Sequence, residues 1–211
     1  MSTFAKRERL LLADLLETAG PDATTLCEGW LTRDLAAHVV VRERRPDAAG
    51  GLVIKQLAPR LEKVMEEYTD KPYEELIQLI RSGPPRFSPF QLKQIDEMSN
   101  TIEFYVHAED VRRAQADWTS RELDPVFQDA LWSRLERTAR LMGRAVPTGL
   151  VLRRPDGQTT VAHRGTPVVT VTGEPSELLL FLYGRQNAAK VDVDGDADAI
   201  TKLEESRQLG I

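Results

Sequence analysis

The chain has 211 residues, of which 28 are Lys or Arg and 33 are Asp or Glu, so its formal net charge at pH 7 is −5. Hydrophobic residues make up 41% and charged residues 29%. These proportions are typical of a globular protein, and they exclude a fully disordered or fibrous chain. The acidic balance also argues against a protein that binds nucleic acid or anionic lipid through its overall charge.

Neither a membrane span nor a disulfide is expected. The longest apolar run, Leu178–Tyr183, is far shorter than the roughly 20 residues that cross a bilayer. Charged residues interrupt the leucines of residues 1–20, so no signal peptide is predicted. Because Cys27 is the one cysteine, no internal disulfide can form, and we expect a cytoplasmic protein.

The first part of the chain is predicted to be helical. The leucines of residues 11–16 recur at helical spacing, and Gly20-Pro21 should end that helix. Thr32 is a candidate N-cap for the second helix, which should stop before Pro46. We expect four helical stretches in an antiparallel four-helix bundle, namely Phe4–Ala19, Thr32–Arg45, Ile54–Arg81 with a break at Lys71-Pro72, and Phe90–Ala116.

A change of pattern near residue 120 predicts a second, smaller α/β domain. Pro175 suits the first turn of a helix, and Asp196 can cap the last one. The expected elements are helix Pro125–Gly143, strands Leu150–Arg153, Thr159–His163 and Val168–Thr172, helix Pro175–Tyr183, strand Val191–Val193 and helix Ala197–Gln208. The predicted fold class is therefore α+β, with domains over residues 1–118 and 119–211.

The segment from residue 100 to residue 110 carries three ionisable side chains along one helix face. At about 100° per residue, Glu103 and His107 lie about 40° apart, and Asp110, about one turn onward, lies about 20° to the other side of Glu103, so that all three share one face. The apolar residues that flank this stripe are Ile102, Val106, Phe104 and Val111. Burying such groups is costly unless they are paired, hydrogen-bonded or bound to a metal.

A second histidine that should face the bundle interior is His38, which follows Leu35 by three residues on the second helix. Two imidazoles and one carboxylate from facing helices suit a divalent transition metal and leave a position open for water or substrate. Asp110 would then hold one imidazole in a single tautomer. The alternative interpretation is a buried His–Glu pair that is only a satisfied core interaction.

Three segments of the chain resemble a known family. Thr25–Trp30, Arg33–His38 and the Glu103-x-x-x-His107-x-x-Asp110 motif look like the DinB-type bundle of the mycothiol-dependent maleylpyruvate isomerase family. The resemblance implies a DinB-like bundle over residues 1–118, with His38, Glu103 and His107 as ligands of a divalent metal. Zinc is the usual metal, and nickel or iron tolerate the same donors. The domain over residues 119–211 is similar to the sterol-carrier-like domain of those enzymes.

The resemblance also implies a chemistry. In that family the thiol of mycothiol binds the open metal position as thiolate and adds to a small electrophile, giving isomerisation or S-transfer. Arg185, which matches an arginine of the second domain, or Arg112 would receive an acidic group of the substrate, and Asp110 would orient His107. For Arg185, a cation favoured by a helix end is the alternative, and for Arg112 it is a solvated helix residue. Homodimerisation is common in this superfamily and is expected here.

Several alternatives stay open at this point. The same ligand set also occurs in modules that bind a metal or a small ligand without catalysis. Cys27 is either a reactive thiol near the metal or a small buried hydrophobic residue. The segment Arg42–Arg45 could face the mouth of the same cleft or form ion pairs within its helix. His163 is interpreted as an exposed residue of a polar hairpin.

Overall fold

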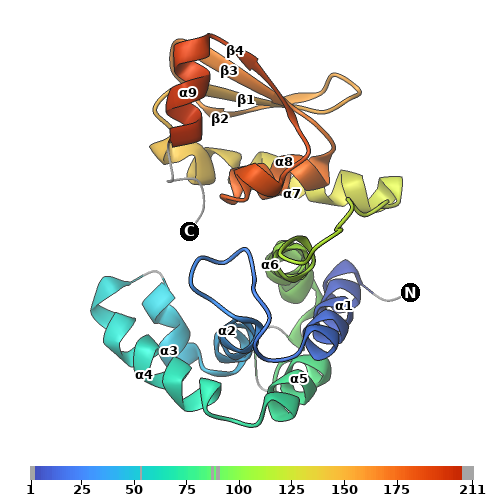
Figure 1. Ribbon diagram of the computed structural model, residues 1–211, viewed down its shortest axis with the longest axis vertical. Helices are drawn as coiled ribbons and strands as arrows, with labels where there is room; N and C mark the ends of the chain where they lie inside the picture. The colour runs from blue at the N-terminus through green and yellow to red at the C-terminus, as the bar shows by residue number, and fades with distance from the viewer. Residues whose placement is uncertain (1–2, 53, 87, 89–90, 206–211) are drawn as a thin grey trace. The chain divides into compact units, whose positions relative to one another are not determined.

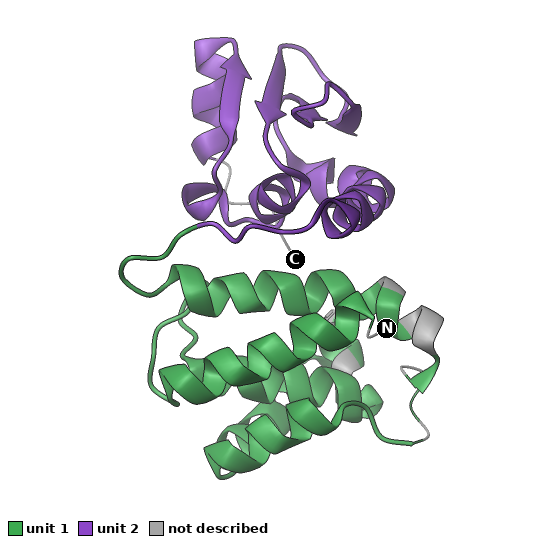
Figure 2. Ribbon diagram, turned by 90° about the vertical axis from the view of Figure 1, so that its right-hand side faces the viewer, with its two compact units in different colours: residues 1–119 green, residues 120–211 purple. Residues whose placement is uncertain are grey.

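The structure is a computed structural model that describes residues 3–52, 54–86, 88 and 91–205 (Figure 1). The chain divides into two compact units, residues 1–119 and residues 120–211, which Figure 2 colours separately. The described residues form nine α-helices and one four-stranded sheet, which confirms the α+β class. Among these residues no helix is long and apolar enough to cross a membrane.

The first unit is helical. Its α-helices are α1 (Phe4–Ala19), α2 (Thr32–Arg44), α3 (Pro46–Ala49), α4 (Ala58–Thr69), α5 (Tyr73–Ser82) and α6 (Lys93–Arg113), with short 3-10 turns at Gly50–Leu52 and Lys55–Leu57. Helix α1 packs against α5 and α6, and α2 packs against α4 and α5. The expected start of the last helix at Phe90 lies outside the described residues. The third predicted stretch is two helices, because Pro72 separates α4 from α5 as expected.

The ends of α1 and α2 follow from local chemistry, with one correction to the prediction. Gly20 ends α1 with a φ of 77°, and its N–H donates to the Leu16 carbonyl at 3.0 Å. Thr32, however, is the first residue of α2 and not its N-cap. The Asp34 carboxylate accepts from the Leu31 N–H at 2.9 Å, so Leu31 takes the cap position, while the Thr32 hydroxyl donates to the Gly20 carbonyl.

A buried ion network fixes how α1, α2 and α6 meet. Arg9 of α1 donates from Nη2 to Glu43 Oε1 of α2 at 2.7 Å and to Asp96 Oδ1 of α6 at 3.2 Å. Asn100 of α6 bridges the same two carboxylates, at 3.3 Å to Glu43 and 2.7 Å to Asp96. Because removing one partner would leave a buried charge unpaired, this network holds α2 and α6 in one register.

The second unit packs helices on a mixed sheet. Its elements are α7 (Pro125–Met142), β1 (Gly149–Arg153), β2 (Thr159–His163), β3 (Val168–Thr172), α8 (Pro175–Leu182), β4 (Asp192–Gly195) and α9 (Ala197–Glu205), with 3-10 turns at Gly143–Ala145 and Gln186–Ala188. The strand order is β2-β1-β3-β4, with β1 and β3 parallel and the outer pairs antiparallel. Helices α7 and α8 pack against each other and lie along the sheet (Figure 1).

Every second side chain of β1 and β3 points into the core of this unit. Leu150 and Leu152 of β1 pair in register with Val169 and Val171 of β3, and all four are fully buried. The predicted cap of the last helix is confirmed, because Asp196 Oδ1 accepts from the Ala199 N–H at 3.1 Å. The last strand begins and ends slightly later than predicted, at Asp192–Gly195, and the expected helix end at Gln208 lies outside the described residues.

Candidate metal centre

Helices α2 and α6 bring two imidazoles and one carboxylate together. His38 lies in the middle of α2, while Glu103 and His107 lie one turn apart on α6. Glu103 Oε1 is 3.3 Å from His38 Nε2 and 3.3 Å from His107 Nε2. Both histidines are 9% exposed and Glu103 is half-buried, so the three groups lie at the edge of the helical core.

The spacing of these three atoms fits the ligand shell of a metal ion as well as it fits long hydrogen bonds. One donor atom from each residue lies within 4.8 Å of the other two. Donor atoms about 2.0–2.1 Å from a tetrahedral zinc ion lie about 3.3 Å from one another. A nitrogen–oxygen hydrogen bond is most often about 2.9–3.0 Å long. The two distances of 3.3 Å therefore match the edges of a coordination tetrahedron.

Without a metal, the cluster is held by charge. Burial lowers the pKa of His38, although the hydrogen bond to Glu103 opposes this effect. Burial alone would raise the pKa of Glu103, but hydrogen bonds to His107 and His38 hold it well below its usual value. For His107, burial acts to lower the pKa, and the hydrogen bonds with Asp110, Cys27 and Glu103 outweigh it and hold this pKa well above its usual value. The metal-free cluster is thus a neutral His38 beside an ion pair of Glu103 and protonated His107.

Asp110 is hydrogen-bonded to His107. Its carboxylate is fully buried, and Oδ2 lies 2.9 Å from His107 Nδ1, an ordinary hydrogen-bond length. A carboxylate at this position holds a proton on Nδ1, so that the proton a metal would displace from His107 is the one on Nε2, which faces Glu103. This is the contact that the spacing of the sequence motif predicts for Asp110.

Cys27 shares that carboxylate. The loop before α2 carries Cys27, whose Sγ lies 3.2 Å from Asp110 Oδ2, and the Leu26 N–H donates to the Asp110 carbonyl at 3.1 Å. Cys27, His107 and Asp110 form a second group whose donor atoms lie within 4.8 Å of one another. Cys27 is half-buried, packs against the helical core and hydrogen-bonds through its thiol to Asp110, and a reactive thiol near the metal stays a prediction.

Arg42 of α2 contacts the Glu103 carboxylate. Arg42 follows His38 by one helical turn, its Nε lies 3.2 Å from Glu103 Oε1, and its Nη1 donates to Asn100 Oδ1 at 2.5 Å. Of the two interpretations of the segment Arg42–Arg45, ion pairs within the helix or a position facing the cleft, the contact with Glu103 places Arg42 beside the site. The four-residue step from His38 is the signal that could have placed Arg42 at the site.

Ring contacts, including one from Trp30, complete the surroundings of the two histidines. Trp30 packs against His38 with ring centroids 5.1 Å apart, and the His38 and His107 rings lie 5.3 Å apart, nearly edge to face. These contacts restrict both imidazoles to one orientation. A site whose ligand side chains are held in this way needs little reorganisation to bind a metal.

The two arginines predicted to receive the substrate have other contacts in the structure. Arg112 Nη1 binds both oxygens of Glu109, at 2.8 and 3.0 Å, and its Nη2 donates to the Thr119 carbonyl at 3.0 Å. Arg185 belongs to the second unit, where its Nη1 donates to the Tyr183 carbonyl at 2.5 Å. Neither residue belongs to the His38, Glu103 and His107 group, and their role stays a prediction.

The fold is similar to that of two solved structures. No family model matches the chain, and no curated protein matches it by sequence. Two solved structures do match: a mycothiol-dependent maleylpyruvate isomerase, at a TM-score of 0.57 and 18% identity, and a histidine-to-alanine mutant of such an isomerase, at 0.58 and 17%. Each match covers 92% of this chain and 96% of the other. The chain therefore has the fold of these isomerase structures, which confirms at the level of the fold the resemblance that its motifs predict.

Proposed function

We propose that this protein is a metal-dependent, thiol-using isomerase or S-transferase, in which a small thiol of the mycothiol type adds to a small, electrophilic, acidic substrate. The observation that carries the proposal is the pair of 3.3 Å distances from Glu103 Oε1 to the two imidazole Nε2 atoms. The fold likeness to a mycothiol-dependent maleylpyruvate isomerase supports the choice of thiol and of reaction class.

The metal would be held by His38, Glu103 and His107, and we propose zinc, although nickel or iron accept the same donors. A divalent metal bound there lowers the pKa of a coordinated thiol and so supplies a nucleophile at neutral pH. In this proposal residues 1–118 form a DinB-like metal-binding bundle, and residues 119–211 form a sterol-carrier-like α/β domain.

The protein's own residues prepare the site. Asp110 holds the proton of His107 on Nδ1, so that Nε2 stays available as a donor atom. Arg42 contacts the Glu103 carboxylate and offsets its charge. Trp30 covers one side of His38 and limits the access of water. The contacts of Asp110 and Trp30 keep the imidazole donor atoms in place, whereas Arg42 stabilises the Glu103 carboxylate in the metal-free site.

The acidic group of the substrate would be bound by Arg185 or Arg112. Because Arg112 already pairs with Glu109, a substrate carboxylate would have to share this guanidinium. Replacing the responsible arginine by glutamine should raise KM for the acidic substrate and leave kcat almost unchanged, since the contact is the same in the ground and transition states. Mycothiol with maleylpyruvate is the first pair to assay, because the structural neighbour is a maleylpyruvate isomerase.

A visible spectrum of the cobalt-substituted protein tests the proposal. Mycothiol is titrated into the cobalt protein, with 2-mercaptoethanol as a comparison thiol, and a sulfur-to-cobalt charge-transfer band should appear and saturate. Glu103→Gln should lose the cobalt spectrum, whereas His163→Ala, which removes the histidine of β2 outside the cluster, should retain it. A cobalt spectrum that no thiol changes would refute thiol use, and a protein that takes up no cobalt would refute the metal site.

A second candidate is a metal- or small-ligand-binding module without catalysis. The observation that favours it is that every group of the cluster already has a partner in the chain, with Glu103 between His38, His107 and Arg42. This candidate predicts stoichiometric metal together with an unchanged cobalt spectrum on addition of thiol. The titration above therefore separates the two candidates.

The setting of the protein is also part of the proposal. We place it in the cytoplasm, where small thiols stay reduced. We also propose a homodimer, which sedimentation velocity of the full chain would reveal as a species of twice the monomer mass. A single monomeric species at all concentrations tested would contradict the dimer without affecting the metal site.

A further inference from the structure

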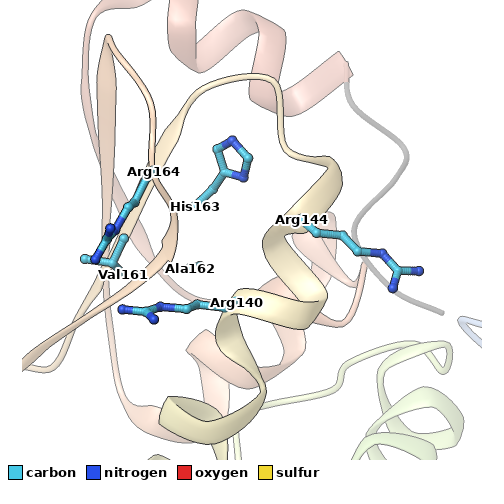
Figure 3. Close-up of a pocket in the computed structure, with 6 residues that line it drawn as sticks. All are labelled: Arg140, Arg144, Val161, Ala162, His163 and Arg164. Atoms are coloured by element: carbon cyan, nitrogen blue, oxygen red, sulfur yellow. The ribbon is translucent and has the colours of Figure 1, made fainter.

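A basic pocket lies within the second unit, formed by residues that the proposed function does not use. It is a hollow of about 340 Å³ between the end of α7 and strand β2 (Figure 3), lined by Arg140, Arg144, Val161, Ala162, His163 and Arg164. Three of these six residues are arginines, and none is acidic. The volume is at the lower end of the range for small-molecule pockets, about 300–1,000 Å³.

The three guanidinium groups lack the side-chain partners that most other arginines have in the described part of the chain. Arg154 in the same unit pairs with Asp129 at 2.8 Å and with Asp156 at 3.3 Å. In contrast, within the part of the chain that the structure describes, the guanidinium groups of the three pocket arginines have no hydrogen-bond or ion-pair partner. Like charges that share one hollow without a carboxylate repel one another, and an anion between them removes that repulsion.

The backbone on both sides of the pocket is held by close glycine contacts. A Cβ at Gly143 would lie 2.7 Å from the Ala162 carbonyl oxygen, so the end of α7 rests directly on β2. A Cβ at Gly149 would clash with the Gly165 carbonyl oxygen, which fixes the segment after β2 against β1. The two segments that carry the arginines are therefore held against each other before any ligand binds.

The orientation of the side chains narrows the choice of ligand. In Figure 3 the Arg140 and Arg164 side chains both extend toward Val161, whereas Arg144 extends away from it. Val161 is 37% exposed and presents an apolar surface between the two charges. Two guanidinium forks beside an apolar residue suit an oxyanion joined to a small apolar body.

A helix-end effect does not explain the whole cluster. Cations near the end of α7 are favoured by the helix dipole, which accounts for Arg140 and Arg144. Arg164 follows an edge strand, where no helix dipole acts, and yet it lines the same hollow. We infer that Arg140 and Arg164 form a binding site for a soluble organic phosphate or carboxylate whose apolar part rests on Val161.

Calorimetric titration of the full chain at constant ionic strength tests this site. The probes are phenyl phosphate, benzoate and inorganic phosphate, and we expect saturable binding of the first two and weaker binding of inorganic phosphate, which lacks the apolar part. Arg140→Gln and Arg164→Gln should each weaken phenyl phosphate binding by about tenfold or more. Arg164→Lys keeps the charge but not the fork, so it should weaken binding by a smaller factor.

The matched control is Arg137→Gln, which removes the same charge from an exposed position of α7, one turn before Arg140 and outside the pocket. It should bind phenyl phosphate like the unmodified protein. Equal weakening in Arg137→Gln, tighter binding of inorganic phosphate, or no saturable binding of either organic probe would overturn the inference. Sedimentation with phosphatidic acid vesicles that is lost in Arg140→Gln would assign the anion to a lipid headgroup and contradict a soluble ligand.

Discussion

His38 and Glu103 are 65 residues apart in the chain, and yet His38 Nε2 lies 3.3 Å from Glu103 Oε1. The contact joins the middle of α2 to the middle of α6 and depends on the register that the buried Arg9, Glu43 and Asp96 network imposes. If this pair and His107 hold a metal, the ion connects α2 and α6, which are far apart in the sequence. Metal binding should then stabilise the native state of the first unit.

Removing the carboxylate ligand should abolish metal binding. Glu103→Gln preserves the shape of the side chain but offers a neutral amide oxygen, a much weaker ligand for zinc. We expect the zinc affinity to fall by more than about 100-fold, beyond the effect typical of residues that only orient a ligand. Competition with a chromophoric chelator measures the affinity, and His163→Ala should leave it unchanged. Equal zinc affinity in Glu103→Gln would show that Glu103 is not a ligand.

Metal affinity should fall as the pH is lowered. The raised pKa of His107 means that this imidazole carries a proton in the metal-free protein at pH values above its usual titration range. Since a metal binds only the neutral imidazole, about one proton is released on binding, and the affinity falls about tenfold per pH unit below that pKa. Calorimetry in buffers of different ionisation enthalpy counts the released proton. A proton count near zero at pH 7 would contradict protonated His107.

Asp110→Asn should separate orientation from ligation. The amide can still accept a hydrogen bond from His107 Nδ1, but it lacks the charge that raises the pKa of His107. We expect a 10–100-fold loss of zinc affinity, about the range for partners of metal-bound histidines, together with proton release that moves to lower pH. A loss of affinity without a change in the pH profile would indicate that Asp110 only supports the fold.

Arg42→Gln should act in opposite directions on the two states of the site. In the metal-free protein Arg42 is one of the partners of Glu103, so its loss should lower the free energy of unfolding by about 1–3 kcal/mol. In the metal-bound protein the same change removes a cation next to the metal, and the zinc affinity should rise a few-fold. Thermal melts with and without zinc, combined with chelator competition, measure both effects. A fall in zinc affinity would contradict this account of Arg42.

Tyr73 gives a test of the fold that does not involve the metal. Its hydroxyl donates to the Leu16 carbonyl at 2.8 Å, and burial raises its pKa to about 12. An unfolded tyrosine has a pKa of about 10. The contribution is complete below about pH 10 and is lost between about pH 10 and pH 12, because the unfolded chain releases this proton first. Urea melts of Tyr73→Phe and the unmodified protein should show that only the latter loses about 2–3 kcal/mol from this group over that range. If the free energy of unfolding fell equally in both proteins between pH 10 and pH 12, the raised pKa of Tyr73 would be contradicted.

Much of the local structure could be predicted from residue patterns. Gly20, Pro72, Pro175 and Asp196 act on the backbone next to them, so the helix boundaries that they set were predictable. The predicted cap of α2, Thr32, lies one residue later than the observed cap, Leu31, because the Asp34 carboxylate accepts from the Leu31 N–H and the Thr32 hydroxyl donates to the Gly20 carbonyl instead.

For the candidate site, contacts within one helix could be predicted from periodicity, and the meeting of His38 with Glu103 from the family resemblance, whereas the remaining contacts between helices could not be predicted. Glu103, His107 and Asp110 share one face of α6, which follows from helical periodicity alone. The contact of Arg42 with Glu103 and that of Cys27 with Asp110 depend on how α2 and the preceding loop lie against α6. That register comes from tertiary packing, and a single sequence does not encode it in any local pattern.

The most direct test of the central claim is the X-ray absorption spectrum of the zinc-loaded full-length protein, recorded before and after addition of mycothiol. We expect about one zinc per chain with two imidazole nitrogens and a carboxylate oxygen at about 2.0–2.2 Å, and a new sulfur ligand at about 2.3 Å once the thiol is present. A zinc ion without imidazole ligands, or a ligand shell that mycothiol leaves unchanged, would contradict the account.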